Sequence, residues 1–182
     1  MNTSSIRIIG GRNKSYRIVF KPTSALRPTT DRVKETLFSW LQFELENKSC
    51  LDLFSGTGSL GLEALSRGAK HVTFVEKEKG LYKNILKNID RLGYGDSMQA
   101  SCSDAFKWIQ TNKKKFDFIF LDPPFDQIDY KNLIKKIYQN DIVNQGGKVI
   151  IETSKHTELK LSNAQDILKN KIIGDVRLII VQ

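Results

Sequence analysis

The sequence predicts an α/β fold in which a mostly parallel sheet is covered by helices on both faces. From residue 49 onward, short apolar segments alternate with segments of helical periodicity, and glycines mark many of the turns between them. This alternation is typical of parallel sheets, whose strands are joined by crossover helices. The chain has 182 residues and no evident internal repeat, which suits one domain of this kind and makes a second full domain unlikely on length alone.

The first 28 residues are predicted to form a basic arm or small β-hairpin, followed by a single Rossmann-like domain over residues 29–182. Tyr16, Ile18 and Phe20 recur at every second position, which is the spacing of a short strand. Two glycines and two prolines interrupt the rest of this segment. We therefore expect it to contribute a hairpin rather than an element of the core.

A helix should begin near Thr29, Thr30 and Asp31. A threonine hydroxyl can cap the first free amides, and Asp31 would lie at the positive end of the helix dipole. Apolar residues then recur at every fourth position and predict one buried face: Val33, Leu37, Leu41 and Leu45.

The remaining elements follow in βα order. Strands are predicted at residues 50–54, 71–75, 98–101, 116–121 and 148–151, the last entered through Gly146 and Gly147. Helices are predicted at residues 60–67 and 80–92, after Asp104, and at 130–140, with Gly68 and Gly93 ending the first two. The chain ends in a predicted hairpin of residues 167–173 and 176–181 around a Gly174-Asp175 turn.

Charge is distributed unevenly along the chain. The net charge is +9, and residues 1–40 hold eight basic and two acidic residues. Such a basic segment is typical of proteins that contact nucleic-acid phosphates, although a solvated basic surface would read the same way. The chain has only two cysteines, no apolar run of membrane-spanning length and no signal-peptide pattern. We therefore expect a cytoplasmic protein without a disulfide framework.

A nucleotide-type cofactor signature occupies residues 56–61, which read Gly-Thr-Gly-Ser-Leu-Gly between a predicted strand and a predicted helix. Glu76 follows twenty residues after Gly56 and can accept hydrogen bonds from ribose hydroxyls. The pattern does not by itself distinguish NAD from other cofactors. Asp52 favours S-adenosylmethionine, because a carboxylate beside the loop would repel a pyrophosphate but attract the ammonium and sulfonium groups of this cofactor.

Further residues complete the predicted cofactor site. Ser103, Asp104 and Ala105 follow the third strand, where a side chain can reach the adenine amine, although Asp104 is also a natural helix cap. Leu53 and Phe54 can form an apolar wall beside the glycine loop, or they can belong to the core. The full candidate set is Asp52, Leu53, Phe54, Ser55, Gly56, Thr57, Gly58, Gly61, Glu76, Lys77, Ser103, Asp104, Ala105 and Asp122.

The candidate catalytic residues are Asp122, Pro123, Pro124 and Phe125, which follow the apolar run of residues 116–121. Prolines cannot continue a sheet, and ligands of open α/β sheets bind beyond the carboxyl ends of the strands. Asp122 and the Pro123 carbonyl can accept hydrogen bonds from the two N–H groups of an exocyclic amine, while the Phe125 ring can stack on the base. The alternative interpretation is that the strand ends in a Pro-Pro loop, that Asp122 has no functional role and that Phe125 belongs to the core.

Several segments together resemble a known family. Residues 52–58 (Asp-Leu-Phe-Ser-Gly-Thr-Gly) and 122–125 (Asp-Pro-Pro-Phe) are similar to class I amino-methyltransferases that act on nucleic-acid bases. Three segments narrow the likeness: residues 7–11 (Arg-Ile-Ile-Gly-Gly), 26–38 (Leu-Arg-Pro-Thr-Thr-Asp-Arg-Val-Lys-Glu-Thr-Leu-Phe) and 61–69 (Gly-Leu-Glu-Ala-Leu-Ser-Arg-Gly-Ala). The chain thus resembles, nearly end to end, the bacterial RsmD family of 16S rRNA (guanine(966)-N(2))-methyltransferases. Compared with that family, the chain is slightly short between its fifth predicted strand and the final hairpin.

This resemblance implies a seven-stranded class I methyltransferase fold, S-adenosylmethionine as cofactor and a guanine of 16S rRNA in the small ribosomal subunit as substrate. The basic segment supplies the predicted RNA-binding residues: Arg7, Arg12, Arg17, Arg27, Thr30 and Arg32. His71 and His156 have no metal-ligand spacing, so we expect no metal. A monomer is the default expectation.

Other functions remain open from the sequence. A DNA base-amine methyltransferase could share both motifs, but no target-recognition domain is evident. A protein-glutamine methyltransferase would favour Asn over Asp122. Two alternatives remain: a non-catalytic RNA-binding assembly factor and an NAD-dependent oxidoreductase. A cofactor-binding titration would distinguish the oxidoreductase from a methyltransferase.

Overall fold

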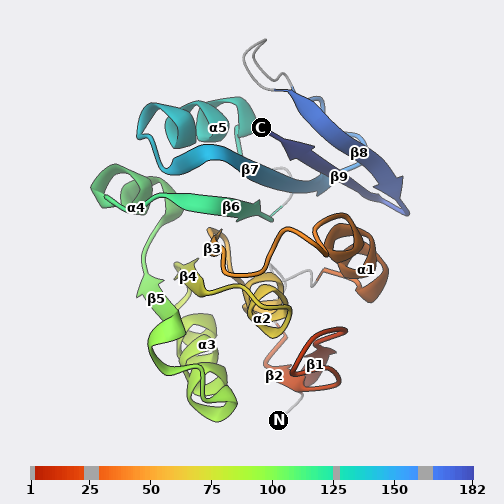
Figure 1. Cartoon of the computed structure of the whole chain (residues 1–182), viewed down its shortest axis with the longest axis vertical. Coiled ribbons are helices and arrows are strands. Elements are labelled where there is room, and N and C mark those ends of the chain that lie inside the picture. The colour runs from red at the N-terminus through yellow and green to blue at the C-terminus, as the bar shows by residue number, and fades with distance from the viewer. Residues whose placement is uncertain (1–2, 23–28, 125–127, 160–165) are drawn as a thin grey trace.

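The computed structural model describes residues 3–22, 29–124, 128–159 and 166–182. Within them, seven strands form one sheet in the order β5-β4-β3-β6-β7-β9-β8 (Figure 1). The strands are β3 (Ser49–Asp52), β4 (His71–Glu76), β5 (Met98–Cys102), β6 (Phe116–Leu121), β7 (Val143–Ser154), β8 (Ile167–Ile173) and β9 (Val176–Val181). β3 to β7 pair in parallel, and β9 is antiparallel to β7 and β8. The predicted fold class, including the C-terminal hairpin, is confirmed.

Helices cover both faces of this sheet. They are α1 (Asp31–Trp40), α2 (Ser59–Ser66), α3 (Lys79–Leu92), α4 (Ala105–Thr111) and α5 (Tyr130–Gln139), with a 3₁₀ turn η1 (Gly95–Ser97) before β5. α1, α2 and α3 share one core with Phe74 and Phe120, whereas α4 and α5 share the other with Ile119. Among the described residues, no helix is long and apolar enough to span a membrane.

The predicted helix signals are present at three helix ends. Thr30 is the N-cap of α1, and its side chain accepts a hydrogen bond from the Val33 amide. Asp104 caps α4 through the amide of Lys107 at 3.1 Å. Gly93 ends α3 with a φ of 66°, which favours glycine. These ends depend on residues close in sequence, which explains why they were predictable.

Other boundaries differ from the prediction. α1 ends at Trp40, although Leu41 and Leu45 are buried as expected in the turns that follow. β3 ends at Asp52 rather than at residue 54. β7 begins at Val143 rather than at residue 148, because Val143 pairs with Phe116 across an irregularity that spans the two glycines.

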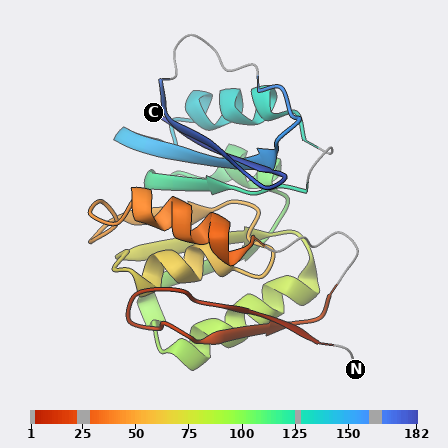
Figure 2. The same cartoon turned by 90° about the vertical axis from the view of Figure 1, so that its right-hand side faces the viewer.

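β1 (Ser4–Arg7) and β2 (Arg17–Phe20) form the predicted hairpin as a separate antiparallel pair. The hairpin lies against α3 and below α2 (Figure 2). Ile8 and Ile18 are buried in the core that α1, α2 and α3 share, so this segment does add to the core, contrary to expectation. The division of the chain into an arm of residues 1–28 and a domain of residues 29–182 stays a prediction.

Two buried charges hold the hairpin in place. Lys34 of α1 is fully buried, donates to the Arg7 carbonyl at 2.5 Å and lies 3.3 Å from the Asp31 carboxylate. Glu63 of α2 is also fully buried and accepts from the Ile9 amide at 2.7 Å. Buried charges are tolerated when they are paired in this way. Lys34 is one of the eight basic residues counted in residues 1–40. Because it is buried, it does not belong to the basic surface that this count predicted.

Candidate active site

Three carboxylates lie where β3, β4 and β6 end. Asp52 and Glu76 are the last residues of β3 and β4, and Asp122 directly follows β6. The strand register aligns Asp52 with Phe74 and Phe120, so Glu76 and Asp122 each lie two residues further along their strands. All three therefore gather at the carboxyl edge of the sheet, where open α/β folds bind ligands.

Asp52 is held by the first turn of α2. Its Oδ2 accepts a hydrogen bond from the Gly61 amide at 3.0 Å, and the residue is 2% exposed. Burial, with smaller contributions from the charges of Asp122 and Glu76, raises the pKa of Asp52 to about 7, although the Gly61 hydrogen bond lowers it. The edge therefore concentrates negative charge, and a cation bound there would relieve the repulsion.

Glu76 closes the glycine loop. Its two carboxylate oxygens accept from the amides of Gly56 and Glu78, each at 2.7 Å. Burial raises the pKa of Glu76, and these two hydrogen bonds oppose that effect. A carboxylate oxygen has two lone-pair directions, so Glu76 can hold the loop and still accept from a ribose hydroxyl.

The three glycines of the motif have different tasks. Gly56 and Gly58 have φ values of 52° and 80°, which favour glycine and make the tight turn into α2. Gly61 lies inside α2, where an added Cβ would come within 2.3 Å of the Phe74 ring. Gly61 therefore serves helix–sheet packing and donates its amide to Asp52.

Ser55 joins the first two strands of the site. Its hydroxyl donates to the Asp52 carbonyl at 2.7 Å and accepts from the Val75 amide at 3.0 Å. Leu53 and Thr57 are buried, and Leu53 packs in the core of the α4 and α5 face. These three predicted residues therefore support the loop from behind.

The remaining predicted cofactor residues differ in burial. Phe54 is partly buried and packs against the same core as Leu53. Ser103 donates its amide to the Glu76 carbonyl at 3.1 Å, and Asp104 follows as the α4 cap. The predicted role of Asp104 as a cap is confirmed, and adenine recognition stays a prediction. Lys77 is exposed and Ala105 is buried.

Asp122 has a partner that the sequence analysis did not identify. The Thr29 hydroxyl donates to Asp122 Oδ2 at 2.9 Å, across 93 residues of sequence, and Thr29 is 4% exposed. Thr29 had been considered only as a helix cap, a role that Thr30 takes. Pro123 is buried and Pro124 half-buried. Phe125 lies outside the described residues.

Glu152 is a fourth acid at this edge that the sequence analysis missed. It follows Ile151, which pairs with Leu121, so its backbone lies beside that of Asp122. Glu152 is 4% exposed, and its carbonyl accepts from the Tyr130 hydroxyl at 3.2 Å. The available signal was the one that identified the other three, an acid directly after a predicted strand.

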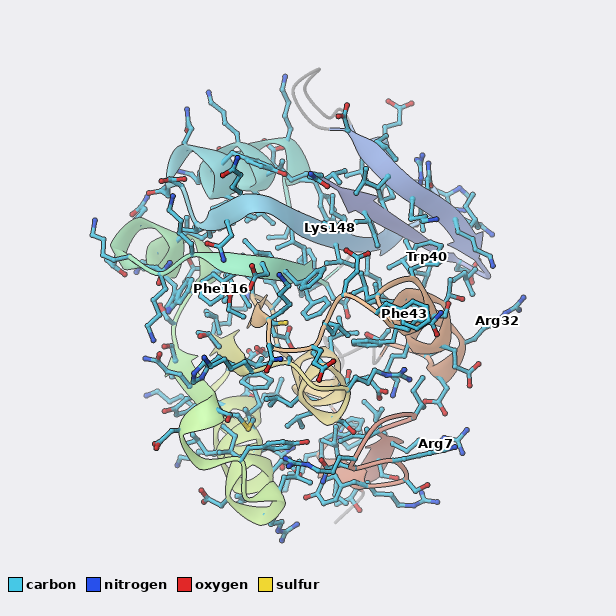
Figure 3. All side chains as sticks on the ribbon, in the orientation of Figure 1. Arg7, Arg32, Trp40, Phe43, Phe116 and Lys148 are labelled. Carbon is cyan, nitrogen blue, oxygen red and sulfur yellow. The ribbon has the colours of Figure 1, made fainter. Side chains whose placement is uncertain are left out.

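The predicted RNA-binding residues do not form one cluster. Arg7 and Arg32 extend from the same side of the molecule (Figure 3). Arg7 pairs with Asp31 at 2.7 Å, and Arg17 lies opposite Arg7 in the hairpin. This group surrounds the start of α1, whose N-cap Thr30 is exposed.

Arg12 lies elsewhere. Its amide donates to the Ser66 carbonyl at 2.7 Å, at the end of α2 remote from the glycine loop. Its guanidinium stacks on the Tyr94 ring, 4.7 Å from the centroid. Arg27 lies outside the described residues. The described basic residues thus divide between the start of α1 and the far end of the hairpin.

Taken together, the edge can hold a cationic ligand and place an acid beside it. Within the part of the chain that the structure describes, no group of three or more His, Cys, Asp or Glu residues is arranged to hold a metal ion. The charges of Asp122 and Glu76 both disfavour the ionised form of Asp52. A pyrophosphate would add to this repulsion, whereas an ammonium or sulfonium would reduce it.

Comparisons with known proteins identify the family and the fold of the chain. A family described as "Conserved hypothetical protein 95" matches residues 6–182. Ribosomal RNA small subunit methyltransferase D of Haemophilus influenzae is 38% identical over 175 residues, which cover 94% of this chain and 90% of that protein. An Escherichia coli protein of known structure, described as putative methyltransferase yhhF, has a TM-score of 0.87 at 30% identity, with 98% of each chain covered.

A more distant neighbour shares the fold. The T. thermophilus 16S rRNA N2 G1207 methyltransferase, solved with AdoMet and guanosine, has a TM-score of 0.75 over the whole of this chain and half of its own. Its sequence is 21% identical, so the likeness concerns the class I architecture.

Proposed function

The chain belongs to the family described as "Conserved hypothetical protein 95" and to its RsmD members, and we propose that it methylates the exocyclic N2 amine of a guanine in 16S rRNA. Family membership makes it an S-adenosylmethionine-dependent rRNA methyltransferase of the small subunit. The observation that carries the base chemistry is Asp122 followed by two prolines at the carboxyl edge, next to Asp52 and Glu76. Position 966 is the guanine that the family resemblance implies.

The residues at the edge fit S-adenosylmethionine. Asp52 would attract its cationic amino-acid part, and Glu76 would accept from its ribose. The turn through Gly56 and Gly58 lets the backbone approach a ligand. When bound, this cofactor supplies an electrophilic methyl group on a sulfonium. Asp104 would accept from the adenine amine with the carboxylate that also caps α4.

Asp122 would orient the base. The exocyclic amine of guanine is a weak nucleophile because its lone pair is delocalised into the ring. Asp122 and the Pro123 carbonyl can accept hydrogen bonds from its two N–H groups and aim the lone pair at the methyl group. Such positioning can lower the activation barrier by up to about 7–11 kcal/mol. Positive charge builds on the nitrogen during transfer, and the Asp122 carboxylate would stabilise it. Phe125 would stack on the base.

The target guanine has to leave any helix to reach this edge. Arg7, Arg17 and Arg32 surround the start of α1, whose preceding residue Thr30 is exposed. These residues would contact RNA phosphates, with Arg27 in the segment before α1 and Arg12 at the far end of the hairpin. An rRNA substrate would place the protein in the bacterial cytoplasm as a partner of the small subunit, and we propose that it acts as a monomer.

Methyl transfer from labelled S-adenosylmethionine tests this proposal on three substrates: hypomethylated small subunits, protein-free 16S rRNA and duplex DNA. We expect label on the subunit or its RNA, recovered as N2-methylguanosine after digestion. Label only on DNA would identify a DNA base methyltransferase. Cofactor binding without label on any substrate would indicate a non-catalytic assembly factor. Either result would overturn the proposed function.

A further inference from the structure

Thr29 holds the carboxylate to which the proposed function assigns the base amine. Its Oγ1 donates to Asp122 Oδ2 at 2.9 Å, and it is almost fully buried. A hydrogen bond to an ionised group is stronger than one between neutral groups. A hydrogen bond from a buried threonine to a half-buried carboxylate 93 residues away indicates a specific task for the hydroxyl.

The donor itself is firmly anchored. Thr29 directly precedes Thr30, the N-cap of α1. In the first turn of α1, Asp31 pairs with Arg7 at 2.7 Å and with the fully buried Lys34 at 3.3 Å. Lys34 also donates to the Arg7 carbonyl, which ties the hairpin to the same turn. Thr29 therefore presents its hydroxyl from a rigid helix start.

A neutral donor suits this position electrostatically. Asp122 lies close enough to Asp52 to raise its pKa, and Glu152 lies near the end of the neighbouring strand β7. A lysine or arginine beside Asp122 would offset this negative charge but would also repel a cationic cofactor. A hydroxyl fixes the carboxylate orientation and adds no charge.

We propose that Thr29 is a positioning residue for methyl transfer, which orients Asp122 so that its carboxylate accepts the N–H of the target amine along the required direction. This inference rests on the proposed function. Oδ2 accepts the Thr29 hydroxyl, which fixes the orientation of the carboxylate, and a carboxylate can accept more than one hydrogen bond at a time. Misorientation of a reacting group by a fraction of an ångström reduces the chemical step more than it reduces binding.

The test compares Thr29→Val, Thr29→Ser and Thr36→Val in the full chain. Valine keeps the shape of threonine and removes the donor, whereas serine restores the hydroxyl. Thr36 is the matched control, because its hydroxyl donates to the Arg32 carbonyl at 3.0 Å on the exposed side of the same helix. The readouts are kcat and KM for methyl transfer to the RNA substrate and Kd for S-adenosylmethionine.

We expect Thr29→Val to lower kcat by about 10- to 100-fold, the range for a lost hydrogen bond to a charged group, with KM for RNA and cofactor Kd nearly unchanged. Thr29→Ser should recover most of kcat, and Thr36→Val should match the wild type. Recovery in the serine variant, which folds with the same hydroxyl, separates positioning from a loss of stability.

Two results would overturn the inference while the proposed function stands. The first is wild-type kcat in Thr29→Val, and the second is equal loss in the valine and serine variants. An inactive wild type on every RNA substrate would instead overturn the proposed function, and with it the role of Thr29.

Discussion

Asp52 ends β3 and Asp122 follows the adjacent parallel strand β6, yet the structure holds their carboxylates in different ways. Asp52 accepts from the backbone amide of Gly61, nine residues later in the chain. Asp122 accepts from the side chain of Thr29, 93 residues earlier. The cofactor half of the edge is thus assembled within one βαβ unit, whereas the proposed catalytic half depends on the segment before α1.

This difference implies that the two halves can be separated experimentally. A backbone amide persists through most substitutions, so the loop around Asp52 and Glu76 should keep its geometry when other regions change. The Asp122 carboxylate depends on a side chain that a single substitution removes. Cofactor binding and methyl transfer should therefore respond to different mutations.

The largest expected effect is on catalysis. Asp122→Asn keeps the shape of the side chain and removes its charge, so kcat should fall by about 10²- to 10³-fold, as for other groups that stabilise transition-state charge. Titration should show that S-adenosylmethionine still binds. Glu44→Gln is the matched control, because Glu44 pairs with Lys148 outside the site. Wild-type turnover in Asp122→Asn would contradict the mechanism.

The counterpart substitution in the cofactor half is Asp52→Asn. The amide keeps an acceptor for the Gly61 amide but no longer attracts a cation. We expect the Kd for S-adenosylmethionine to rise by roughly tenfold or more, which corresponds to about 1.4 kcal/mol. Calorimetric titration measures this directly, with Asp90→Asn on the exposed surface of α3 as control. Unchanged affinity in Asp52→Asn would rule out charge attraction.

The same substitution should change how stability depends on pH. The pKa of Asp52 is raised from 3.8 to about 7 in the folded protein, so the folded state binds a proton more tightly than the unfolded chain. Stability of the ligand-free protein should therefore fall as pH rises from about 4 to about 7 and stay reduced above that range.

Asp52→Asn removes this titration. The variant should match the wild type near pH 4 and exceed it at pH 8 by on the order of 1 kcal/mol, since relaxation of the site reduces the full penalty of a buried charge. Urea unfolding at the two pH values measures the difference. A variant that is less stable than the wild type at pH 8 would show that the charge is not a burden to the fold.

The smallest expected effect concerns the RNA surface. Arg32→Ala should weaken RNA binding by several-fold and reduce the slope of log affinity against log salt by about 1, with cofactor affinity unchanged. Lys135→Ala on α5 removes the same charge from the opposite face of the sheet and is the control. Equal losses in the two variants would indicate a general charge effect.

Much of the fold was predictable because its signals are local. The caps at Thr30, Asp104 and Gly93 act within a few residues of the helix ends they mark. Strand-then-acid order identified Asp52, Glu76 and Asp122, since parallel strands bring their carboxyl ends to one edge. The same rule applied to residues 148–151 would have identified Glu152.

The α/β class, the order of the elements and three of the acids at the carboxyl edge could be deduced from the sequence, because periodicity and turn chemistry are properties of neighbouring residues. Three features came only from the folded chain: Lys34 is buried and donates to the Arg7 carbonyl, β7 begins at Val143, and Thr29 reaches Asp122. These features depend on which distant segments pack together. The paired residues lie 27 residues apart in the first two cases and 93 in the third, separations over which a sequence pattern carries no pairing information.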